Sequence, residues 1–487
     1  MKFGEIYLKI KLEETGKLGL WRLVAIVFGS VIGGSIFNIA QNMAHGAALG
    51  AVLCAWMVTG LGIMFLVLTF RRLVKLRPDL NAGIYQYAQE GFGNYWGFNM
   101  AWGYWLCVVL GNVTYAVLLN DSLGAFFPIL NRHGWETVVF GTALVWLMYY
   151  IVTRGIQQAS YINTFMSALK FGCIVFILII LAISVKVGYF STDFWGNLNP
   201  ALPSVGGQVS SCMLVSIWSF LGIEGAMMMS ARAKRRSDVG KATMVGFTLA
   251  LSLYVLVTTL CFGIMSQPEL AALPNPSLAY ALEACAGPWA KWFVISAIIV
   301  SVAGGFVAWT LLCAQTPYEA AVVKIFPSKF LSVNNHGVPA YGMRISSVTM
   351  TLCLLLVVTA EDVYLAAVNL ASMMILPCYF FCGLYLFKLS LSSTLRMPFK
   401  IKTSLTVIAS CTMVYCGYSM WAGSLYLLML TSTFYLAGSP FFFMARRHKK
   451  SHESIMTGSE KILFVFLIAM TCVSVWMLIT GKLALDG

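Results

Sequence analysis

One acidic residue, Glu224, lies near the middle of an apolar run that extends from about Val209 to Met229. A run of this length can cross a bilayer as a helix, and a carboxylate at its centre is costly unless another group compensates for it. Gly222 and Gly225 flank the carboxylate, and glycines allow a membrane helix to unwind so that a ligand can approach its backbone. A buried Glu that is hydrogen-bonded to a neighbouring helix, with glycines for close packing, would have the same pattern. This stretch therefore indicates either a binding site or a packing contact.

A comparable interruption is present in the first apolar run, about residues 20–43, in which Gly33, Gly34 and Ser35 come shortly after Val31. Glycines also serve helix packing in membranes, but a double glycine with a serine disrupts a helix more than packing requires. In an unwound membrane helix, the amides that begin a half-helix favour an anionic group such as a carboxylate, and the carbonyls that end a half-helix favour a cation. The two interruptions together predict a binding site for a small charged molecule at the membrane midplane.

Other side chains lie at about the same predicted depth as these interruptions. Trp218 and Trp309 each have an indole that can stack on a guanidinium or ammonium group, although a tryptophan in a membrane helix more often packs or anchors the helix. Asn112, in the middle of another apolar run, can bind a polar ligand or simply link two helices. Glu224 is the only acidic residue well inside a predicted span. It can be a direct partner of a cationic substrate or a proton carrier, and the residues do not separate these roles.

The composition is that of a membrane protein with many spans. Of the 487 residues, 59% are hydrophobic and only 10% are charged, and the mean hydropathy is +0.81. Because a soluble domain carries about 25% charged residues, we predict an all-α polytopic membrane protein. The net charge of +14 is spread over short loops between apolar runs. Such a distribution indicates orientation in a membrane, and no nucleic acid is expected as a partner.

The remaining reactive residue types argue against an enzyme. The 13 cysteines are scattered through the apolar runs without CxxC pairs, and none of the five histidines lies at mid-span, so neither a metal nor another cofactor is expected. The loops are too short for a soluble catalytic domain, and no mid-span nucleophile is accompanied by a base. No cleavable signal peptide is recognisable. The sequence thus favours a membrane protein that binds or transports a small ligand.

The apolar runs predict about 12–13 transmembrane helices. The third covers about Tyr95 to Leu119 and is followed by an outer loop from Asn120 to Glu136. The strongly charged connectors on one side are basic, which places them and the N-terminus inside the cell. The interruptions fall in the first and sixth spans, whose orientations are opposite, and this predicts a five-plus-five inverted-repeat transporter core with broken first and sixth helices. The predicted organisation is a cytoplasmic N-terminal segment (1–19), a first repeat with spans one to five (20–187), a second repeat with spans six to ten (209–388), spans 11 and 12 (403–445), a basic cytoplasmic segment (446–461) and an extra span (462–481).

Several motifs are similar to those of a known transporter superfamily. They extend from Gly29 to Phe37, from Trp218 to Gly225, from Ser230 to Thr243 and from Trp309 to Leu312. On these motifs the chain resembles, over about residues 18–445, the basic amino acid/polyamine antiporters of the amino acid–polyamine–organocation superfamily. Within that family, the stretches 81–88 and 91–93 are similar to the arginine/ornithine and arginine/agmatine exchangers.

The resemblance implies roles for the two interrupted segments. The break at Gly33–Ser35 would bind the α-carboxylate of an amino acid, and carbonyls near Val31 and Ile223 would face its α-amino group. Glu224 would be the proton-sensitive residue.

The resemblance also implies roles for side chains on other spans. Asn112 and the neighbouring Cys107 would receive the guanidinium end of the substrate, and Trp309 would stack on its methylene groups. Trp218 would close the outer gate, and Tyr104 matches a tyrosine of the inner gate.

The chain departs from the acid-resistance members of that family at two positions. It has Ser30 where they have an asparagine in the first break, and Gly34 where they have a serine. These changes remove side-chain polarity from the site, so the substrate preference need not match theirs. The thirteenth predicted span also departs from the members that have 12 spans.

The function implied by the resemblance is an antiporter that imports arginine in exchange for an internal cationic product, agmatine or ornithine, by alternating access. The resemblance further implies the cytoplasmic (inner) membrane of a bacterium, with the N-terminus inside, contact with membrane lipid, and a homodimer as a candidate assembly. Two alternatives stay open. One is a proton-coupled lysine or arginine permease with Glu224 as its proton site, and the other is a nutrient sensor that binds its ligand without transporting it.

Overall fold

The computed structural model describes residues 19–80, 82–132, 134–154, 156–225, 233–357, 362–392, 397–446 and 454–480. Its regular elements are α-helices and short 3-10 helices, which confirms the prediction of an all-α protein. Nine of the described helical segments are long and apolar enough to cross a membrane. They are α4 (Leu49–Leu76), α6 (Asn94–Gly124), α7 (Trp135–Thr153), α13 (Arg236–Phe262), α16 (Pro288–Val322), α18 (Val363–Leu391), α19 (Phe399–Ala422), α20 (Leu425–Ala437) with α21 (Ser439–Arg446), and α22 (Gly458–Ile479).

The other predicted spans also have helical counterparts. The first, fifth and sixth correspond to shorter apolar helices, and the ninth corresponds to α17. These elements are α2 (Leu20–Val31), the last part of α8 (Ile156–Ser184), α10 (Val205–Ser211) with α11 (Met213–Trp218), and α17 (Ala340–Val357). The connecting elements are η1 (Ser35–Phe37), α3 (Ile39–Ala44), α5 (Tyr85–Phe92), η2 (Pro128–Arg132), α9 (Gly188–Thr192), α14 (Gln267–Ala271), α15 (Ser277–Ala286) and η4 (Ser328–Leu331).

The interruption predicted in the first span is confirmed. Helix α2 ends at Val31, the chain bends through Ile32 and the two glycines, and the short helices η1 and α3 continue the span. The backbone groups at the end of α2 and at the start of η1 are therefore not used within a continuous helix.

The sixth span is also interrupted where the sequence predicted. Helix α11 ends at Trp218, and turns follow as far as Glu224. Gly222 has a φ of +99°, a conformation that side chains with a Cβ rarely adopt. Residues 226–232, and with them the start of the Ser230–Thr243 motif, lie outside the described residues.

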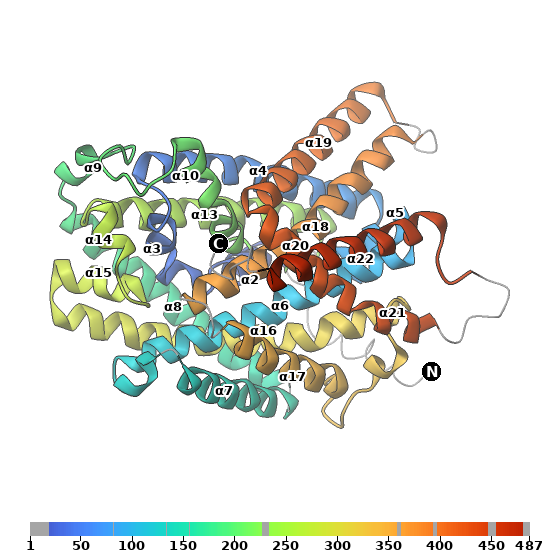
Figure 1. Cartoon of the computed structure of the whole chain (residues 1–487), viewed down its shortest axis with the longest axis horizontal. Coiled ribbons are helices and arrows are strands. Elements are labelled where there is room, and N and C mark those ends of the chain that lie inside the picture. Colours follow the sequence, from blue (N-terminus) through green and yellow to red (C-terminus); the bar gives the residue numbers. More distant parts are fainter. Residues whose placement is uncertain are drawn as a thin grey trace.

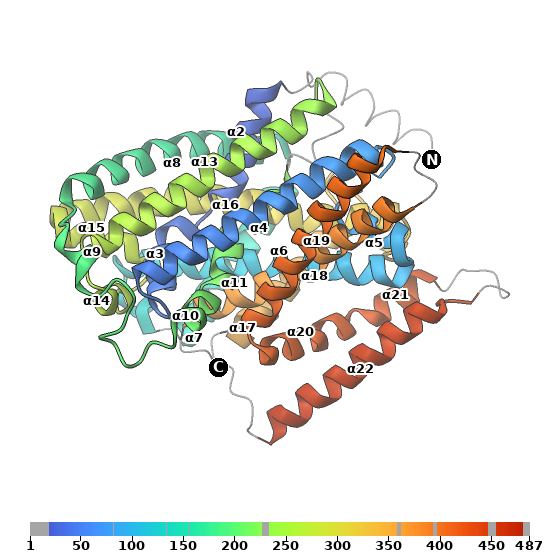
Figure 2. The ribbon, with the colours of Figure 1, turned by 90° about the horizontal axis from the view of Figure 1, so that it is seen from above.

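Helix α6 forms the centre of the protein (Figure 1). Its most apolar part is fully buried, and α5, α16 and α18 pack along it. Helix α2 packs against α13, which runs beside α4 and α8 in the view of Figure 2. Helix α22, the extra span, packs against α20 at one edge of the protein, and most of its apolar side chains are exposed. The two broken spans are thus held around one buried helix, which positions the candidate site.

The predicted end of the third span near Leu119 is wrong, because α6 continues to Gly124. Asn120 and Asp121 are polar and suggested an exposed loop, yet both are buried in the last turns of the helix. The Asn120 side chain donates to the Leu130 carbonyl at 3.0 Å, so the segment containing η2 supplies the hydrogen bond that water would supply in a loop.

Candidate functional site

Two polar side chains from other helices contact the carbonyls at the first break. Lys170 of α8 is 8% exposed, and its ammonium group donates to the carbonyls of Ile32 and Gly29, the latter at 3.5 Å. The Tyr254 hydroxyl of α13 donates to the Val31 carbonyl at 3.0 Å. The carbonyl end of a helix favours a cation, so Lys170 stabilises the interrupted end of α2. Sequence reasoning missed Lys170, although a lysine inside the apolar run of the fifth span was a visible signal.

The amide side of the first break begins at Gly34 and Ser35. The Ser35 and Tyr254 hydroxyls share a hydrogen bond of 2.7 Å. The first amides of a helical turn have no acceptor within that turn, so these groups can bind an external oxygen atom. Val31, Gly33, Gly34 and Ser35, which were predicted as site residues, are therefore together at one break, and the Val31 carbonyl is already engaged by Tyr254.

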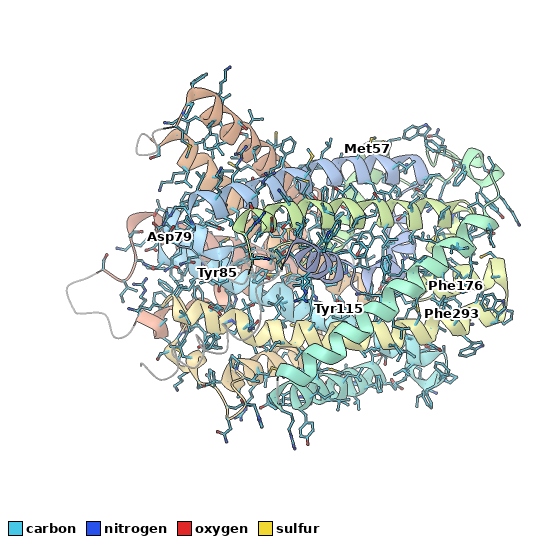
Figure 3. All side chains as sticks on the ribbon, turned by 180° about the vertical axis from the view of Figure 1, so that it is seen from behind. Met57, Asp79, Tyr85, Tyr115, Phe176 and Phe293 are labelled. Carbon is cyan, nitrogen blue, oxygen red and sulfur yellow. The ribbon has the colours of Figure 1, made fainter. Side chains whose placement is uncertain are left out.

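Tyr115 of α6 lies directly against the glycines of the first break. Its ring is between the two glycines and Gly305 of α16: a Cβ at Gly33 would be 2.7 Å from the Tyr115 hydroxyl oxygen, and one at Gly305 would be 3.3 Å from Cζ. A Cβ at Gly34 would be 3.4 Å from Cε1 of the same ring, so Tyr115 packs against both glycines. Figure 3 shows Tyr115 deep in the middle of the protein. Its position next to the first break was not predicted, because only the fold brings α6 there.

The two breaks contact each other through Ser30. The Ser30 hydroxyl donates to the Gly222 carbonyl at 2.9 Å, although the two residues are far apart in the chain. A Cβ at Gly222 would lie 2.7 Å from the Ser30 carbonyl oxygen, so a larger residue could not approach so closely. Ser30, which stands where the acid-resistance members have an asparagine, therefore joins the two breaks in this chain.

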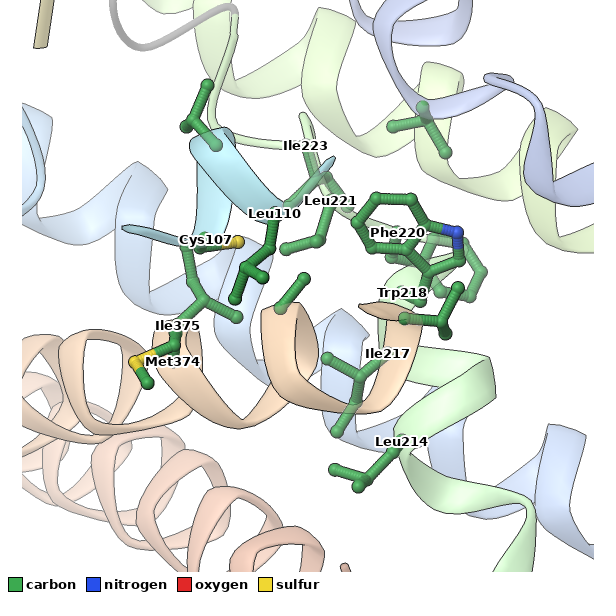
Figure 4. Close-up of a cluster of buried hydrophobic side chains, with 14 of the residues drawn as sticks. Cys107, Leu110, Leu214, Ile217, Trp218, Phe220, Leu221, Ile223, Met374 and Ile375 are labelled. Atoms are coloured by element: carbon green, nitrogen blue, oxygen red, sulfur yellow. The ribbon is translucent and has the colours of Figure 1, made fainter. Parts of the chain in front are cut away.

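Glu224 is buried at the second break and accepts hydrogen bonds from two tyrosines. Tyr104 of α6 donates to one carboxylate oxygen at 3.0 Å, and Tyr379 of α18 donates to the other at 2.9 Å. Cys107, one turn from Tyr104 on α6, and the fully buried Ile223 line the same region (Figure 4). Tyr379 was not predicted, because its distance from Glu224 in the chain hides the contact.

The two predicted indoles meet over Gly111. The rings of Trp218 and Trp309 are 5.9 Å apart with an interplanar angle of 53°, and a Cβ at Gly111 would collide with Trp309 at 2.6 Å. The Tyr115 ring is 5.9 Å from Trp309 in an edge-to-face arrangement. Tyr115 therefore connects the first break to the indole pair, and Figure 4 shows Trp218 among the apolar residues around the second break.

Asn112 lies next to this group and is fully buried. Its amide nitrogen donates to the Val108 carbonyl at 2.8 Å and to the Cys313 sulfur at 3.2 Å, and its oxygen accepts from Thr310 at 3.1 Å. A guanidinium group would have to share the Asn112 oxygen with Thr310. Both Thr310 and Cys313 were missed, although Thr310 directly follows a residue that was singled out.

The predicted site residues form three adjoining groups: the first break, the indole pair with Asn112, and the second break with Glu224. Among the described residues, no group of three or more His, Cys, Asp or Glu side chains could hold a metal ion. The arrangement has hydrogen-bond donors, an aromatic wall and one carboxylate, which suits the binding of an organic molecule with both negative and positive groups. Because these groups lie on apolar helices that can cross a membrane, the features define an integral membrane protein with a site suited to a small organic molecule.

Comparison with known proteins identifies the family. The family model described as "Amino acid permease" matches residues 18–423, and the chain belongs to this family. It is 37% identical to the arginine/agmatine antiporter of Chlamydia pneumoniae, over 97% of this chain and 99% of that protein. It is 38% identical to the arginine/ornithine antiporter of Pseudomonas aeruginosa, also over 97% of this chain and 99% of that protein. The chain is thus a transporter and not an enzyme, as the sequence predicted.

Proposed function

We propose that this protein is an antiporter that imports arginine in exchange for an internal cationic product, agmatine or ornithine. The observation that supports this most directly is the contact of the two broken spans beside the indole pair, in a chain whose relatives are named arginine antiporters. Interrupted helices that meet at mid-membrane are suited to bind a small charged substrate and to alternate its access.

The proposed substrate position follows from the chemistry of each group. The α-carboxylate lies at Gly33–Ser35, and the α-amino group faces carbonyls near Val31 and Ile223. The side chain extends along Trp309 toward Asn112 and Cys107. A guanidinium over an indole face is stabilised by a cation–π interaction, which favours arginine over an uncharged amino acid.

The proposed gates lie on either side of this substrate. Trp218 closes the outer path, and Tyr104 closes the inner path. The hydrogen bonds of Tyr104 and Tyr379 to Glu224 support an inner closure that depends on the state of that carboxylate. Glu224 acts there either as the proton-sensitive residue or as a direct partner of the cationic substrate. The pH profile of exchange by Glu224→Gln separates these roles.

We further propose two inverted repeats, spans one to five and six to ten, in the cytoplasmic membrane of a bacterium with the N-terminus inside. The exposed apolar side chains of α22, such as Ile462, Val465 and Ile479, support contact with lipid. A homodimer is the assembly to test, and light scattering of the protein in detergent measures it.

The experiment that tests the proposed function is uptake of labelled arginine into proteoliposomes that contain no amino acid, arginine, ornithine, agmatine or lysine. We expect uptake only into loaded vesicles. Uptake into empty vesicles in response to a pH gradient would contradict exchange and identify a proton-coupled permease. Binding of arginine without uptake under any condition would identify a sensor.

A membrane potential distinguishes the two proposed products. Exchange of arginine for ornithine replaces one monocation by another and is electrically silent. Exchange for agmatine, a dication, moves one net charge outward per cycle, which changes the driving force by about 2.3 kcal/mol per 100 mV. A rate that responds to an imposed potential therefore indicates agmatine, and a rate that does not respond indicates ornithine.

A further inference from the structure

We infer that Tyr115 sets the relative affinity of the site for amino acids and for the amines that lack their carboxylate, because its hydroxyl takes the place of a carboxylate at the first break. This inference rests on the proposed function, which puts the α-carboxylate at Gly33–Ser35. It adds a specificity-determining residue, and it explains how one site can carry both an amino acid and a decarboxylated product.

The position of Tyr115 is the first observation behind this inference. The side chain is 4% exposed, and its hydroxyl oxygen is so close to Gly33 that a Cβ there would be only 2.7 Å away. The edge of the ring lies against Gly34, because a Cβ there would be 3.4 Å from Tyr115 Cε1, and the Gly34 amide is one of the groups proposed to bind the carboxylate. The oxygen of Tyr115 therefore occupies the space that a carboxylate oxygen would need.

The neighbouring hydroxyls are already engaged. Ser35 and Tyr254 are hydrogen-bonded to each other, and Tyr254 also donates to the Val31 carbonyl. Tyr115, by contrast, has its hydroxyl directly against Gly33 and its ring against Gly34. Its ring is supported by Phe306, 6.2 Å away and nearly parallel, and by the edge of Trp309. A shift of the Tyr115 hydroxyl would therefore also move its ring against Trp309, the indole that is proposed to contact the substrate side chain.

The chemistry of the hydroxyl explains the selectivity. A phenol oxygen can accept a hydrogen bond from an amide, as a carboxylate oxygen does. When an amino acid is bound, its carboxylate accepts from the Gly34 amide and displaces the hydroxyl. When the corresponding amine is bound, the Tyr115 hydroxyl stays in place and keeps the amide paired. A buried amide without an acceptor is unfavourable, so an amine would otherwise bind at a penalty that the amino acid avoids.

The test is the Tyr115→Phe variant, which keeps the ring and removes the hydroxyl. Dissociation constants are measured by calorimetry on the purified full-length protein for three matched pairs: arginine and agmatine, ornithine and putrescine, and lysine and cadaverine. Within each pair the side-chain end is the same, and the ratio of the two constants cancels any change in the empty protein. We expect the ratio of amine to amino acid dissociation constants to rise roughly tenfold in every pair that the wild type binds.

The matched control is Tyr435→Phe. Tyr435 is buried like Tyr115, and its hydroxyl donates to the Met374 carbonyl at 2.7 Å. The ratio of amine to amino acid dissociation constants in Tyr435→Phe should equal the wild-type ratio. Tyr115→Met, which is also apolar and lacks a hydroxyl, should reproduce the tenfold rise and replaces the phenylalanine variant if that one does not fold. An unchanged ratio, or a shift toward the amine, would overturn the role of Tyr115 while leaving the antiporter proposal intact. Failure of the wild type to bind any of the six compounds would contradict the proposed function itself, and the Tyr115 inference with it.

Discussion

The first and second breaks differ in the kind of group for which other helices supply a hydrogen-bond partner. At the first break the groups that lack a partner within their own helix are backbone carbonyls. Other helices supply their donors, Lys170 from α8 and Tyr254 from α13. At the second break the titratable group belongs to the broken segment itself, because Glu224 lies in the turn and accepts from Tyr104 and Tyr379 of α6 and α18. One break thus has a buried lysine beside it, and the other contains a buried glutamate.

This difference follows from the polarity of helices. The carbonyl end of α2 attracts a positive group, and an ammonium group in the membrane interior needs several acceptors, so Lys170 and the first break satisfy each other. The second break ends at a carboxylate that can gain or lose a proton while its two tyrosine partners stay nearby. The first break is therefore suited to a constant geometry, and the second to a change of state. Ser30, which donates to Gly222, connects the two breaks.

Replacing Lys170 should have the largest effect. Lys170→Met leaves the carbonyls of Gly29 and Ile32 without this donor in a buried environment, and each such loss costs about 1–3 kcal/mol. We expect the initial rate of arginine exchange in proteoliposomes to fall roughly 100-fold, and the melting temperature of the purified protein to fall as well.

Two further variants make this measurement specific. Lys170→Arg keeps hydrogen-bond donors at the break and should recover part of the rate. Lys186→Met removes an exposed lysine at the end of the same span and should leave the rate unchanged. A normal rate in Lys170→Met would show that the first break needs no buried cation, and the comparison between the breaks would fail.

Glu224→Gln tests the second break. The amide keeps the shape of the side chain but cannot titrate, so we expect exchange to lose most of its pH dependence while binding of arginine changes less than about tenfold. The measurement is the rate of exchange from acidic to neutral pH. Glu136→Gln, on a half-buried carboxylate that pairs with Arg132 far from both breaks in the chain, is the control and should keep the wild-type profile. If Glu224→Gln also keeps that profile, Glu224 has no proton role and acts through structure or substrate contact alone.

Trp309 lies between the two breaks and should have an intermediate effect. Trp309→Ala removes the indole that meets Trp218 and Tyr115, and loss of a cation–π partner costs about 0.5–2 kcal/mol. Arginine affinity, measured by calorimetry, should therefore fall by roughly 3- to 30-fold. Trp421→Ala, at a 71% exposed tryptophan, should not change it. Unchanged affinity in Trp309→Ala would mean that this indole only packs.

The sequence predicted the two interruptions because glycines and a charged residue in apolar runs are local signals. Gly33, Gly34 and Glu224 could be recognised without knowledge of any neighbour, and the structure breaks the helices at those positions. The partners of the breaks could not be predicted in the same way. Tyr379 and Tyr254 are ordinary tyrosines in apolar helices, and only the packing of those helices brings them to the site.

The end of the third span was predicted wrongly, because α6 continues to Gly124. Asn120 and Asp121 suggested a loop because polar residues usually end a span, yet the fold buries them at the end of α6 and supplies the Leu130 carbonyl to Asn120. Lys170 shows the opposite case, because a visible signal was not used. A lysine in a span indicates a buried polar contact as a glutamate does, since both need a partner in the membrane interior.

The smallest effect is expected far from both breaks, at an exposed ion pair after α4. Arg77 donates to Asp79 at 2.6 Å, and this hydrogen bond holds the pKa of the Asp79 carboxyl below its usual range. A carboxyl whose pKa is lowered by folding stabilises the protein above the pKa of the unfolded state, and this contribution is lost as the pH falls through the folded-state value. The Asp79 side chain is 57% exposed, so solvent screening limits the contribution to less than about 1 kcal/mol.

Asp79→Asn should therefore lower the melting temperature by only a degree or two at neutral pH, and the difference from wild type should shrink as the pH falls below the ordinary aspartate pKa of about 4. Thermal unfolding of both proteins in the same detergent across this range measures the effect. High salt should reduce the difference as well, because an exposed pair is screened by ions. A large difference, or one that persists in acid, would show that exposed charges matter as much as the buried charges at the two breaks. A small effect that vanishes in acid would instead confine the strong electrostatic contributions to Lys170 and Glu224, where water is excluded.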